Sequence, residues 1–313
     1  MSARMDAVQI TDVTKTFGTV TAVDDLSLII PQGSVYGFIG PNGSGKSTTM
    51  RMIVNIFYPD RGSIRVFGEE RRGVGSEHHI GYLPEERGLY RQMNVQTLLE
   101  FYGELRAGRR VTSEVKDWLR RLDLEQWGSK KVEALSKGMS QKVQFIATVV
   151  PEPKLLILDE PFTGLDPVSA DAIRSAVLEL RGRGSTVILS THDMNVAASL
   201  CDYIFMIFRG KKVLDGTLAA IQSQYGNDIA RVSVAGGVAS VQNLAGVTQV
   251  RDHGQFQDLR IGPGCDPQQV LHTLTARTAV TSFAVVQPSL QDIFVRIAGP
   301  AALEDAAKES SAA

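Results

Sequence analysis

The fold of this 313-residue chain is decided by the stretch Gly40-Pro41-Asn42-Gly43-Ser44-Gly45-Lys46-Ser47. An apolar run, Val35–Ile39, precedes it, and a helix-like segment, Thr48–Ile56, follows. The stretch fits G-x-x-x-x-G-K-[ST], in which glycines let the loop curl so that backbone N–H groups and a helix N-terminus face phosphate oxygens. Lys46 is expected to reach the β- and γ-phosphates of a nucleotide, and the Ser47 hydroxyl to ligate Mg²⁺. The predicted nucleotide-binding residues here are Gly40, Pro41, Asn42, Gly43, Ser44, Gly45, Lys46, Ser47 and Thr48.

Two acidic residues follow a second apolar run. Leu155–Leu158 is expected to be a buried strand that carries Asp159 to its carboxyl end, where ligands bind in open α/β sheets. Asp159 is placed to hold Mg²⁺ through water, and Glu160 to polarise the water that attacks the γ-phosphate. A plain strand end is the alternative, but the phosphate loop upstream argues against it.

A histidine follows a third run of the same kind. The strand Thr186–Leu189 leads into Ser190-Thr191-His192-Asp193 and is expected to lie beside the Asp159 strand. His192 would then lie close to the γ-phosphate and hold the phosphate and water in geometry. The alternative is an ordinary solvated histidine at a strand end.

The first ~220 residues alternate strands and helices, which predicts an α/β fold with a parallel-sheet core. Val8–Val13 and Ala22–Ile30 alternate apolar and polar residues, as an antiparallel flank does. Residues 90–140 are expected to form a helical subdomain, including a helix capped by Ser113. The apolar stripe of that helix is expected to contain Val115, Trp118, Leu119 and Leu122.

The end of the chain is expected to form a second unit. We place a boundary after residue 225, a small α+β domain over 226–299 and a disordered tail over 300–313. The domain's predicted order is β-α-β-β-α-β, a ferredoxin-like arrangement. The five clearest elements are Arg231–Val234, Val247–Asp252, Asp258–Ile261, the helix Pro267–Arg277 and Val280–Val286, with a short helix at Val238–Leu244.

Composition limits the class of protein. The 33 Lys and Arg residues nearly balance 34 Asp and Glu residues, so no global electrostatic attraction to nucleic acid and no nucleic-acid partner are expected, with a local basic patch left open. The two cysteines, Cys201 and Cys265, have no CxxC spacing and are expected to be buried apolar side chains in a reducing cytoplasm. The first ten residues do not read as a signal peptide, and no apolar run approaches the ~18 residues of a membrane span. Any membrane work is therefore expected to require a partner.

Two further motifs name a family. The run Leu135-Ser136-Lys137-Gly138-Met139-Ser140-Gln141-Lys142 precedes Asp159, and Gly164-Leu165-Asp166-Pro167 follows Glu160. In this order they resemble the nucleotide-binding domain of ABC ATPases over about residues 5–220, which implies a P-loop ABC ATPase cassette with ATP and Mg²⁺ as its cofactors. In that family two such domains stack head to tail.

The resemblance implies roles for four more residues. Ser136 and Gly138 would face the γ-phosphate held by a second nucleotide-binding domain, an identical copy or a close relative. Asp166 would belong to the loop that couples the two sites. Phe17, in Lys15-Thr16-Phe17-Gly18, matches the aromatic residue that stacks on adenine, although a core position would explain it as well.

Three positions depart from the family pattern. Lys137 and Met139 change the usual L-S-G-G-Q signature. Glu85 stands where the family has the glutamine that senses Mg²⁺ and couples to the membrane domain, and its carboxylate is expected still to bind metal or its water. These changes bear on rate and coupling rather than on ATP binding.

The segment Pro288-Ser289-Leu290-Gln291-Asp292-Ile293-Phe294 resembles the element closing the accessory domain in bacterial ABC exporters whose permeases are encoded separately. The segment Leu83–Tyr90 resembles the same branch. This implies an ATP-hydrolysing exporter subunit that drives integral membrane permease subunits, cytoplasmic and peripheral on the inner face of the cell membrane. A small packed helix would explain Leu290, Ile293 and Phe294 equally well. Other functions left open are an importer subunit, a soluble ABC ATPase acting on DNA or the ribosome, and a regulator that binds ATP without turnover.

Overall fold

The computed structural model describes residues 6–71, 79–86, 88–226 and 228–299. The chain divides into two compact units, Met1–Thr217 and Leu218–Ala313. The boundary between these units precedes the one predicted after residue 225. The tail 300–313, for which disorder was predicted, lies outside the described residues.

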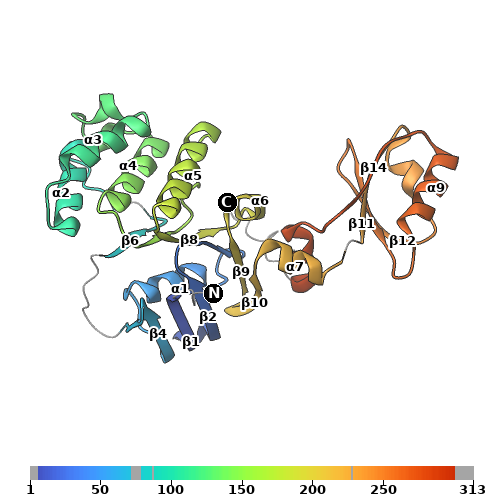
Figure 1. The fold of residues 1–313 in the computed structure, drawn as a ribbon, viewed down its shortest axis with the longest axis horizontal. Coiled ribbons are helices and arrows are strands. Elements are labelled where there is room, and N and C mark those ends of the chain that lie inside the picture. Colours follow the sequence, from blue (N-terminus) through green and yellow to red (C-terminus); the bar gives the residue numbers. More distant parts are fainter. Residues whose placement is uncertain (1–5, 72–78, 87, 227, 300–313) are drawn as a thin grey trace. The chain divides into compact units, whose positions relative to one another are not determined.

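A six-stranded sheet forms the centre of the first unit, in the order β10-β9-β3-β8-β7-β6 (Figure 1). Its strands are β3 (Val35–Ile39), β6 (Ile80–Leu83), β7 (Leu155–Leu158), β8 (Thr186–Thr191), β9 (Tyr203–Phe208) and β10 (Lys211–Gly216). All neighbouring pairs are parallel except β9 and β10. The predicted parallel-sheet core is therefore confirmed, as is the pairing of β8 with the Asp159 strand β7.

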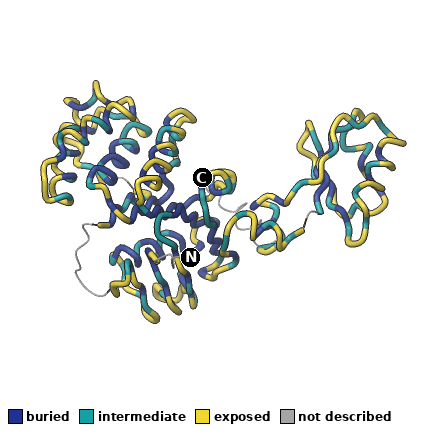
Figure 2. The backbone as a smooth tube through the Cα atoms, viewed as in Figure 1, coloured by how far each residue is buried: buried dark blue, intermediate teal, exposed yellow. Residues whose placement is uncertain are grey.

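The sheet is covered on both faces, which explains why its strands are continuously apolar. Along β7, Leu156 and Leu158 join the core under the helices, whereas Leu155 and Ile157 join the core on the other face. Figure 2 shows these strands as a buried band inside the unit, with exposed residues on the outer surfaces of the helices. Burying alternate side chains in two cores leaves the strand ends as the places where polar groups can reach a ligand.

One face of the central sheet is covered by α1 (Lys46–Ile53) and by an antiparallel sheet of order β2-β1-β4-β5. The strands of this sheet are β1 (Asp6–Phe17), β2 (Val20–Pro31), β4 (Arg61–Val66) and β5 (Glu69–Glu70). They include the two segments predicted to alternate, so the antiparallel flank is confirmed.

The opposite face carries α2 (Val95–Ala107), α3 (Thr112–Arg121), α4 (Lys137–Val149) and α5 (Pro167–Gly182) (Figure 1). In α3 the predicted stripe is buried. The predicted cap is wrong, because α3 begins at Thr112, and Ser113 lies inside it with its hydroxyl donating to Glu114. Two short helices, α6 (Met194–Leu200) and α7 (Leu218–Gln224), follow along the chain. None of the helices in the described ranges combines the length and apolarity that a bilayer span requires.

The second unit contains a four-stranded antiparallel sheet of order β12-β13-β11-β14. Its elements are β11 (Ile229–Val234), α8 (Gly237–Val241), β12 (Val247–Asp252), β13 (Gln257–Ile261), α9 (Pro267–Arg277) and β14 (Val280–Val286). Both helices contribute to one core against the sheet. The order along the chain is the predicted β-α-β-β-α-β. In the sheet, β13 lies between β11 and β12, and β11 lies between β13 and β14, so a strand of the other β-α-β unit separates the two strands of each unit.

Residues 290–299 form a further helix. The Ser289 hydroxyl accepts from the backbone N–H of Asp292 at 3.1 Å, and the Asp292 carboxylate accepts from the N–H of Ser289 at 3.1 Å. This reciprocal pair is a capping box. Leu290 and Ile293 are buried, and Arg251 from β12 pairs with Asp292. The motif at 288–294 therefore has a local structural role: it starts this helix and fixes it within the second unit.

Candidate nucleotide site

The phosphate loop connects the end of β3 to the start of α1. Lys46 is the first residue of α1 and is 5% exposed. Its ammonium donates to the carbonyl oxygens of Gly40 at 2.7 Å and Pro41 at 3.0 Å. The lysine side chain therefore folds back over the loop that precedes it and is held by hydrogen bonds to the start of that loop. A cation held over a curled loop at a helix N-terminus is the arrangement that binds phosphate.

Glycine is required at two positions of this loop. Gly40 has φ +151°, and a Cβ there would lie 2.3 Å from the carbonyl oxygen of Ile207 in β9. Gly45 has φ +110°, and a Cβ there would lie 2.4 Å from the carbonyl oxygen of Ala22 in β2. The loop is therefore packed against backbone on two sides, which fixes its curl. Asn42 and Gly43 remain exposed at its tip.

Asp159 lies fully buried at the carboxyl end of β7. Its Oδ1 accepts from the Ser190 hydroxyl at 2.6 Å and from the Ser47 hydroxyl at 3.2 Å. Its Oδ2 has no hydrogen-bond partner within the described residues. A buried carboxylate oxygen without a partner is costly unless a ligand satisfies it.

This donor set suits a hard divalent cation. Mg²⁺ is typically bound by one or two carboxylates, with water and substrate phosphates completing its shell. Asp159 and Ser47 lie together at the start of α1 and offer the free carboxylate oxygen and the hydroxyl that such an ion takes. The residues present therefore fit Mg²⁺ bound beside phosphate.

Glu160 adopts φ +49°, a left-handed conformation that non-glycine residues rarely take and that is often found at functional sites. Its backbone N–H donates to the Ser190 hydroxyl at 2.8 Å. Both carboxylate oxygens of Glu160 lie 3.1 Å from Nδ1 of His192. The carboxylate is buried while His192 is 62% exposed. A buried acid next to an open imidazole can bind a water and orient it.

Ser136, Gly138 and Asp166 form a second cluster. Ser136 caps α4, because its hydroxyl accepts from the N–H of Met139 at 3.2 Å. Gly138 lies next to Gly164 and Leu165, and the Lys137 side chain lies over Gly164. The two family motifs therefore meet within one chain.

Asp166 caps α5. Its carboxylate accepts from the Ser169 hydroxyl at 2.6 Å and from the Ser169 N–H at 3.0 Å. These two hydrogen bonds lower the pKa of Asp166. Because folding favours the charged form, this contribution to stability is present above the usual pKa of an aspartate and is lost as the pH falls through the lowered value.

The two remaining predicted residues, Phe17 and Glu85, are exposed. Phe17 is 44% exposed, contacts Phe57 edge-on at 5.2 Å and pairs in the sheet with Val20, close to the Ala22 carbonyl that abuts Gly45. Glu85 is exposed and follows β6, whose Leu83 carbonyl accepts from the N–H of Asp159 at 2.8 Å. Both positions are compatible with contact to a bound nucleotide.

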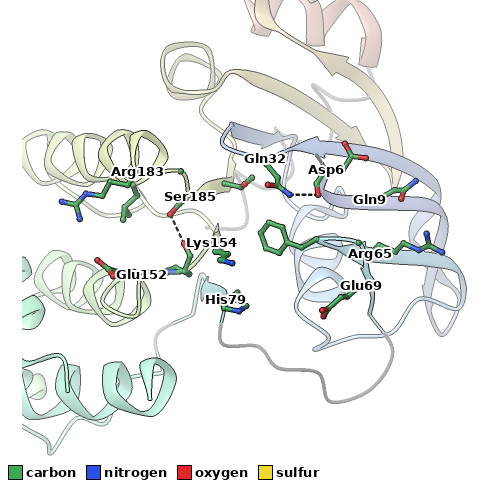
Figure 3. Close-up of a pocket in the computed structure, with 16 residues that line it drawn as sticks. Asp6, Gln9, Gln32, Arg65, Glu69, His79, Glu152, Lys154, Arg183 and Ser185 are labelled. Atoms are coloured by element: carbon green, nitrogen blue, oxygen red, sulfur yellow. Dashed lines mark hydrogen bonds between the residues drawn. The ribbon is translucent and has the colours of Figure 1, made fainter. Parts of the chain in front are cut away.

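A cleft of about 1080 Å³ in the first unit lies elsewhere. Figure 3 shows Gln32 and Arg65 on one side and Lys154, Ser185 and Arg183 on the other. Lys154 and Ser185 precede β7 and β8, so this cleft lies at the opposite ends of the strands from Asp159 and His192. Its cations and carboxylates are mixed, and it is not the phosphate site.

Sequence reasoning missed Ser190, whose hydroxyl joins Asp159 and Glu160. Its place directly after the predicted strand Thr186–Leu189 does not indicate what its hydroxyl contacts. It also missed Gln141 and Gln144, two buried glutamines of α4. Their spacing after Ser136 carries no information on where their side chains donate.

Family comparisons match both units. A family described as "ABC transporter" matches residues 23–163, and one described as "ATP-binding protein DrrA1-3-like, C-terminal domain" matches residues 216–298. A third, "AAA domain, putative AbiEii toxin, Type IV TA system", matches residues 129–198. The first two together cover most of both units.

Individual relatives extend over nearly the whole chain. An uncharacterised ABC transporter ATP-binding protein of Bacillus subtilis, YhaQ, is 37% identical over 92% of this chain and 97% of its own length. The Nod factor export ATP-binding protein I of Sinorhizobium fredii is 32% identical over 94% of this chain and 86% of its own length. A solved "ATP binding subunit of ABC transporter" is 29% identical, with a TM-score of 0.64 over 70% of this chain and 93% of that one. From its fold, its motifs and these relatives, the chain belongs to the ATP-binding subunits of ABC transporters.

Proposed function

We propose that the chain hydrolyses ATP and thereby drives export through a separate membrane permease. One observation carries the catalytic part of this proposal. The buried Glu160 carboxylate lies 3.1 Å from Nδ1 of His192. The preceding residue, Asp159, contacts Ser47 of the phosphate loop. A water-polarising acid, a metal-binding acid and a phosphate loop are thereby brought to one edge of the sheet. This is the set of groups that phosphoryl transfer to water requires.

The residues act mainly by position and charge. Lys46 exchanges its carbonyl partners for β- and γ-phosphate oxygens, while the backbone N–H groups of the loop and α1 face the same anion. Glu160 accepts a hydrogen bond from the attacking water, and His192 holds the water and the γ-phosphate in line. Such orientation, and not covalent chemistry, supplies most of the rate in this class of reaction.

Ser47 and Asp159 would hold Mg²⁺, Asp159 through water, and Glu85 would contact the ion or its water. The chemistry that Mg²⁺ would supply there is neutralisation of charge on the phosphates. The Asp159 oxygen, which has no partner in the part of the chain that the structure describes, supports this assignment.

A second cassette completes each site. Phe17 stacks on adenine with the face that it exposes to solvent. Ser136 and Gly138, at the N-terminus of α4, face the γ-phosphate of the opposite subunit, and Asp166 lies in the loop between the two sites. The partner is a second copy of this chain or a close relative.

An exposed apolar patch on the helical part supports docking of a permease. Tyr90, Phe101 and Leu105 are 58%, 48% and 65% exposed, and residues 90–93 with Phe101 line a hollow of about 420 Å³. Large exposed apolar side chains in one place mark interaction surfaces. The patch follows the Glu85 loop along the chain, so a permease seated there would sense the nucleotide site.

The relatives support the direction and place of action. A similar protein is named for Nod factor export, and the second unit matches the DrrA1-3-like C-terminal domain. These names favour an exporter subunit over an importer or a soluble machine acting on DNA or the ribosome. We place the protein in the cytoplasm, on the inner face of the cell membrane.

The test of this function combines an ATPase assay with co-purification. The purified chain is expected to release phosphate from ATP with Mg²⁺ and to stop when EDTA removes the metal. Gentle detergent extraction of the tagged protein is expected to bring down a multi-span membrane protein in stoichiometric amount. ATP binding without turnover would indicate the regulator, and recovery of ribosomal or DNA-repair proteins alone would contradict the transporter role.

Replacement of Ser190 by alanine is expected to lower both stability and turnover. The change removes one of the two hydroxyls that donate to Asp159 and leaves the Glu160 N–H without its acceptor. An orphaned buried donor costs about 1–3 kcal/mol. The melting temperature should fall by roughly 2–10 °C, and turnover should fall as Glu160 loses its fixed backbone.

Ser185→Ala is the matched control. Its hydroxyl donates to the Pro153 carbonyl at 2.9 Å, just before the other end of β8. We expect this variant to lose some stability and to keep wild-type turnover. Equal turnover in the Ser190 and Ser185 variants would exclude a role for Ser190 in the site.

A further inference from the structure

Helix α4 carries two glutamines that are as buried as core residues. Gln141 and Gln144 are 3% and 5% exposed and lie one turn apart. Buried polar side chains are unfavourable unless they form hydrogen bonds. Both amides leave the helix and donate to backbone carbonyls of other segments.

Gln144 spans the position of Glu85. Its Nε2 donates to the Pro84 carbonyl at 3.4 Å and to the Glu86 carbonyl at 3.3 Å. An amide nitrogen offers two N–H donors, so one side chain can hold both carbonyls. Only the nitrogen end of the amide can satisfy two acceptors, which fixes its orientation.

The other end of this amide makes the residue a poor choice for stability alone. Oε1 of Gln144 is buried and has no hydrogen-bond partner among the described residues. An unpaired buried acceptor is unfavourable, whereas methionine would fill a similar volume without it. The hydrogen bonds to the Glu85 loop are therefore what the glutamine provides.

Gln141 makes a corresponding contact to the backbone that follows the other acid, Glu160. Its Nε2 donates to the Pro161 carbonyl at 3.4 Å, directly after Glu160. The same helix begins at Ser136, the residue predicted to face the partner's nucleotide. One helix thus contacts the loop after Glu160 and the loop around Glu85, and it begins at the residue proposed to face the second cassette.

We propose that Gln144 is a positioning residue that clamps the backbone on both sides of Glu85 and transmits movement of α4 to that carboxylate. The proposal rests on the proposed function, in which Glu85 contacts the metal or its water. When the partner's nucleotide draws in the N-terminus of α4, the Pro84 and Glu86 carbonyls follow the Gln144 amide. Glu85 then moves in step with closure of the site.

The test is a double-mutant cycle on the full chain with Gln144→Met and Glu85→Ala. Methionine keeps the length and helix propensity and removes the donors. Gln144→Met should lower kcat by roughly 2- to 30-fold, the range typical of residues that modulate coupling. If it acts through Glu85, the double variant should turn over no more slowly than Glu85→Ala alone.

Thr148→Val is the matched control. Thr148 lies on the same helix and is also buried, but its hydroxyl donates at 2.9 Å to the Gln144 carbonyl within the helix. Its effect on kcat should be less than about twofold and should multiply with that of Glu85→Ala. Multiplying effects of Gln144→Met and Glu85→Ala would overturn the proposal.

Hydrogen exchange gives a second readout that needs no turnover. Amides of the peptide spanning the Glu85 loop should exchange faster in Gln144→Met than in wild type or Thr148→Val. Unchanged exchange would overturn the proposal. If the wild-type chain hydrolysed no ATP, the proposed function would fail while this measurement still decided whether Gln144 holds the loop.

Discussion

Replacement of Glu160 by glutamine should reduce ATP turnover by about 10²- to 10⁴-fold, the usual contribution of a positioned acid or base. Glutamine keeps the shape of the side chain but cannot accept a proton from water. The contacts of Asp159 with Ser47 and Ser190 do not involve the changed group, so ATP binding should survive. The measured rate of phosphate release should fall by this factor while the affinity for ATP changes little.

The same variant should accumulate in one state. If two cassettes close around ATP and open after hydrolysis, slow hydrolysis leaves them closed, and light scattering with ATP and Mg²⁺ should report a dimer. Glu179→Gln, an exposed acid on α5, is the control and should keep wild-type turnover. Unchanged turnover in Glu160→Gln would remove Glu160 from the catalytic role and return His192 or another group to consideration.

Replacement of Lys46 by alanine should abolish measurable ATP binding under conditions that saturate the wild type. A hydrogen bond to a charged group contributes about 1.5–3 kcal/mol. Loss of contacts to both the β- and γ-phosphates therefore predicts an affinity lower by about 10²- to 10⁴-fold. Titration with a fluorescent ATP analogue gives the affinity directly.

Two controls make the Lys46 result interpretable. Circular dichroism should show that the variant is folded, since the alanine also removes the donor to the Gly40 and Pro41 carbonyls. Lys142→Ala, whose ammonium donates to the Leu122 carbonyl on the helical part, should leave ATP affinity unchanged. Normal affinity in Lys46→Ala would mean that the triphosphate does not lie in the 40–47 loop.

Much of the fold was predictable because its signals are local. The strand β3, the loop after it and the strand β7 were found at or near their observed bounds, since each is an apolar run that ends abruptly in polar residues. The β-α-β-β-α-β order of the second unit was found in the same way. The cap of α3 was wrong, because Thr112 and Ser113 look alike as helix starts and tertiary packing decides between them.

The site was predictable in its residue types but not in its connections. The motifs single out Lys46, Asp159 and Glu160 as candidates, because the chemistry of phosphate and metal narrows the choice of side chains. Nothing in the sequence indicates that the Ser190 hydroxyl joins the two acids, or that Gln144 reaches the carbonyls around Glu85. Such contacts depend on the register of β8 against β7 and on the rotation of α4, both of which are set by packing of the whole unit.

The hydrogen bonds from Lys46 to the Gly40 and Pro41 carbonyls also bear on product release in the proposed hydrolysis of ATP. In the proposed cycle these two carbonyl oxygens compete with an arriving triphosphate for the Lys46 ammonium. After cleavage, we expect the same carbonyls to recapture the lysine and so favour departure of the spent phosphates. The hydrogen bonds between the Lys46 ammonium and these carbonyls are expected to lower the affinity for nucleotide. They are also expected to restore the same loop arrangement after each turnover, before another nucleotide binds.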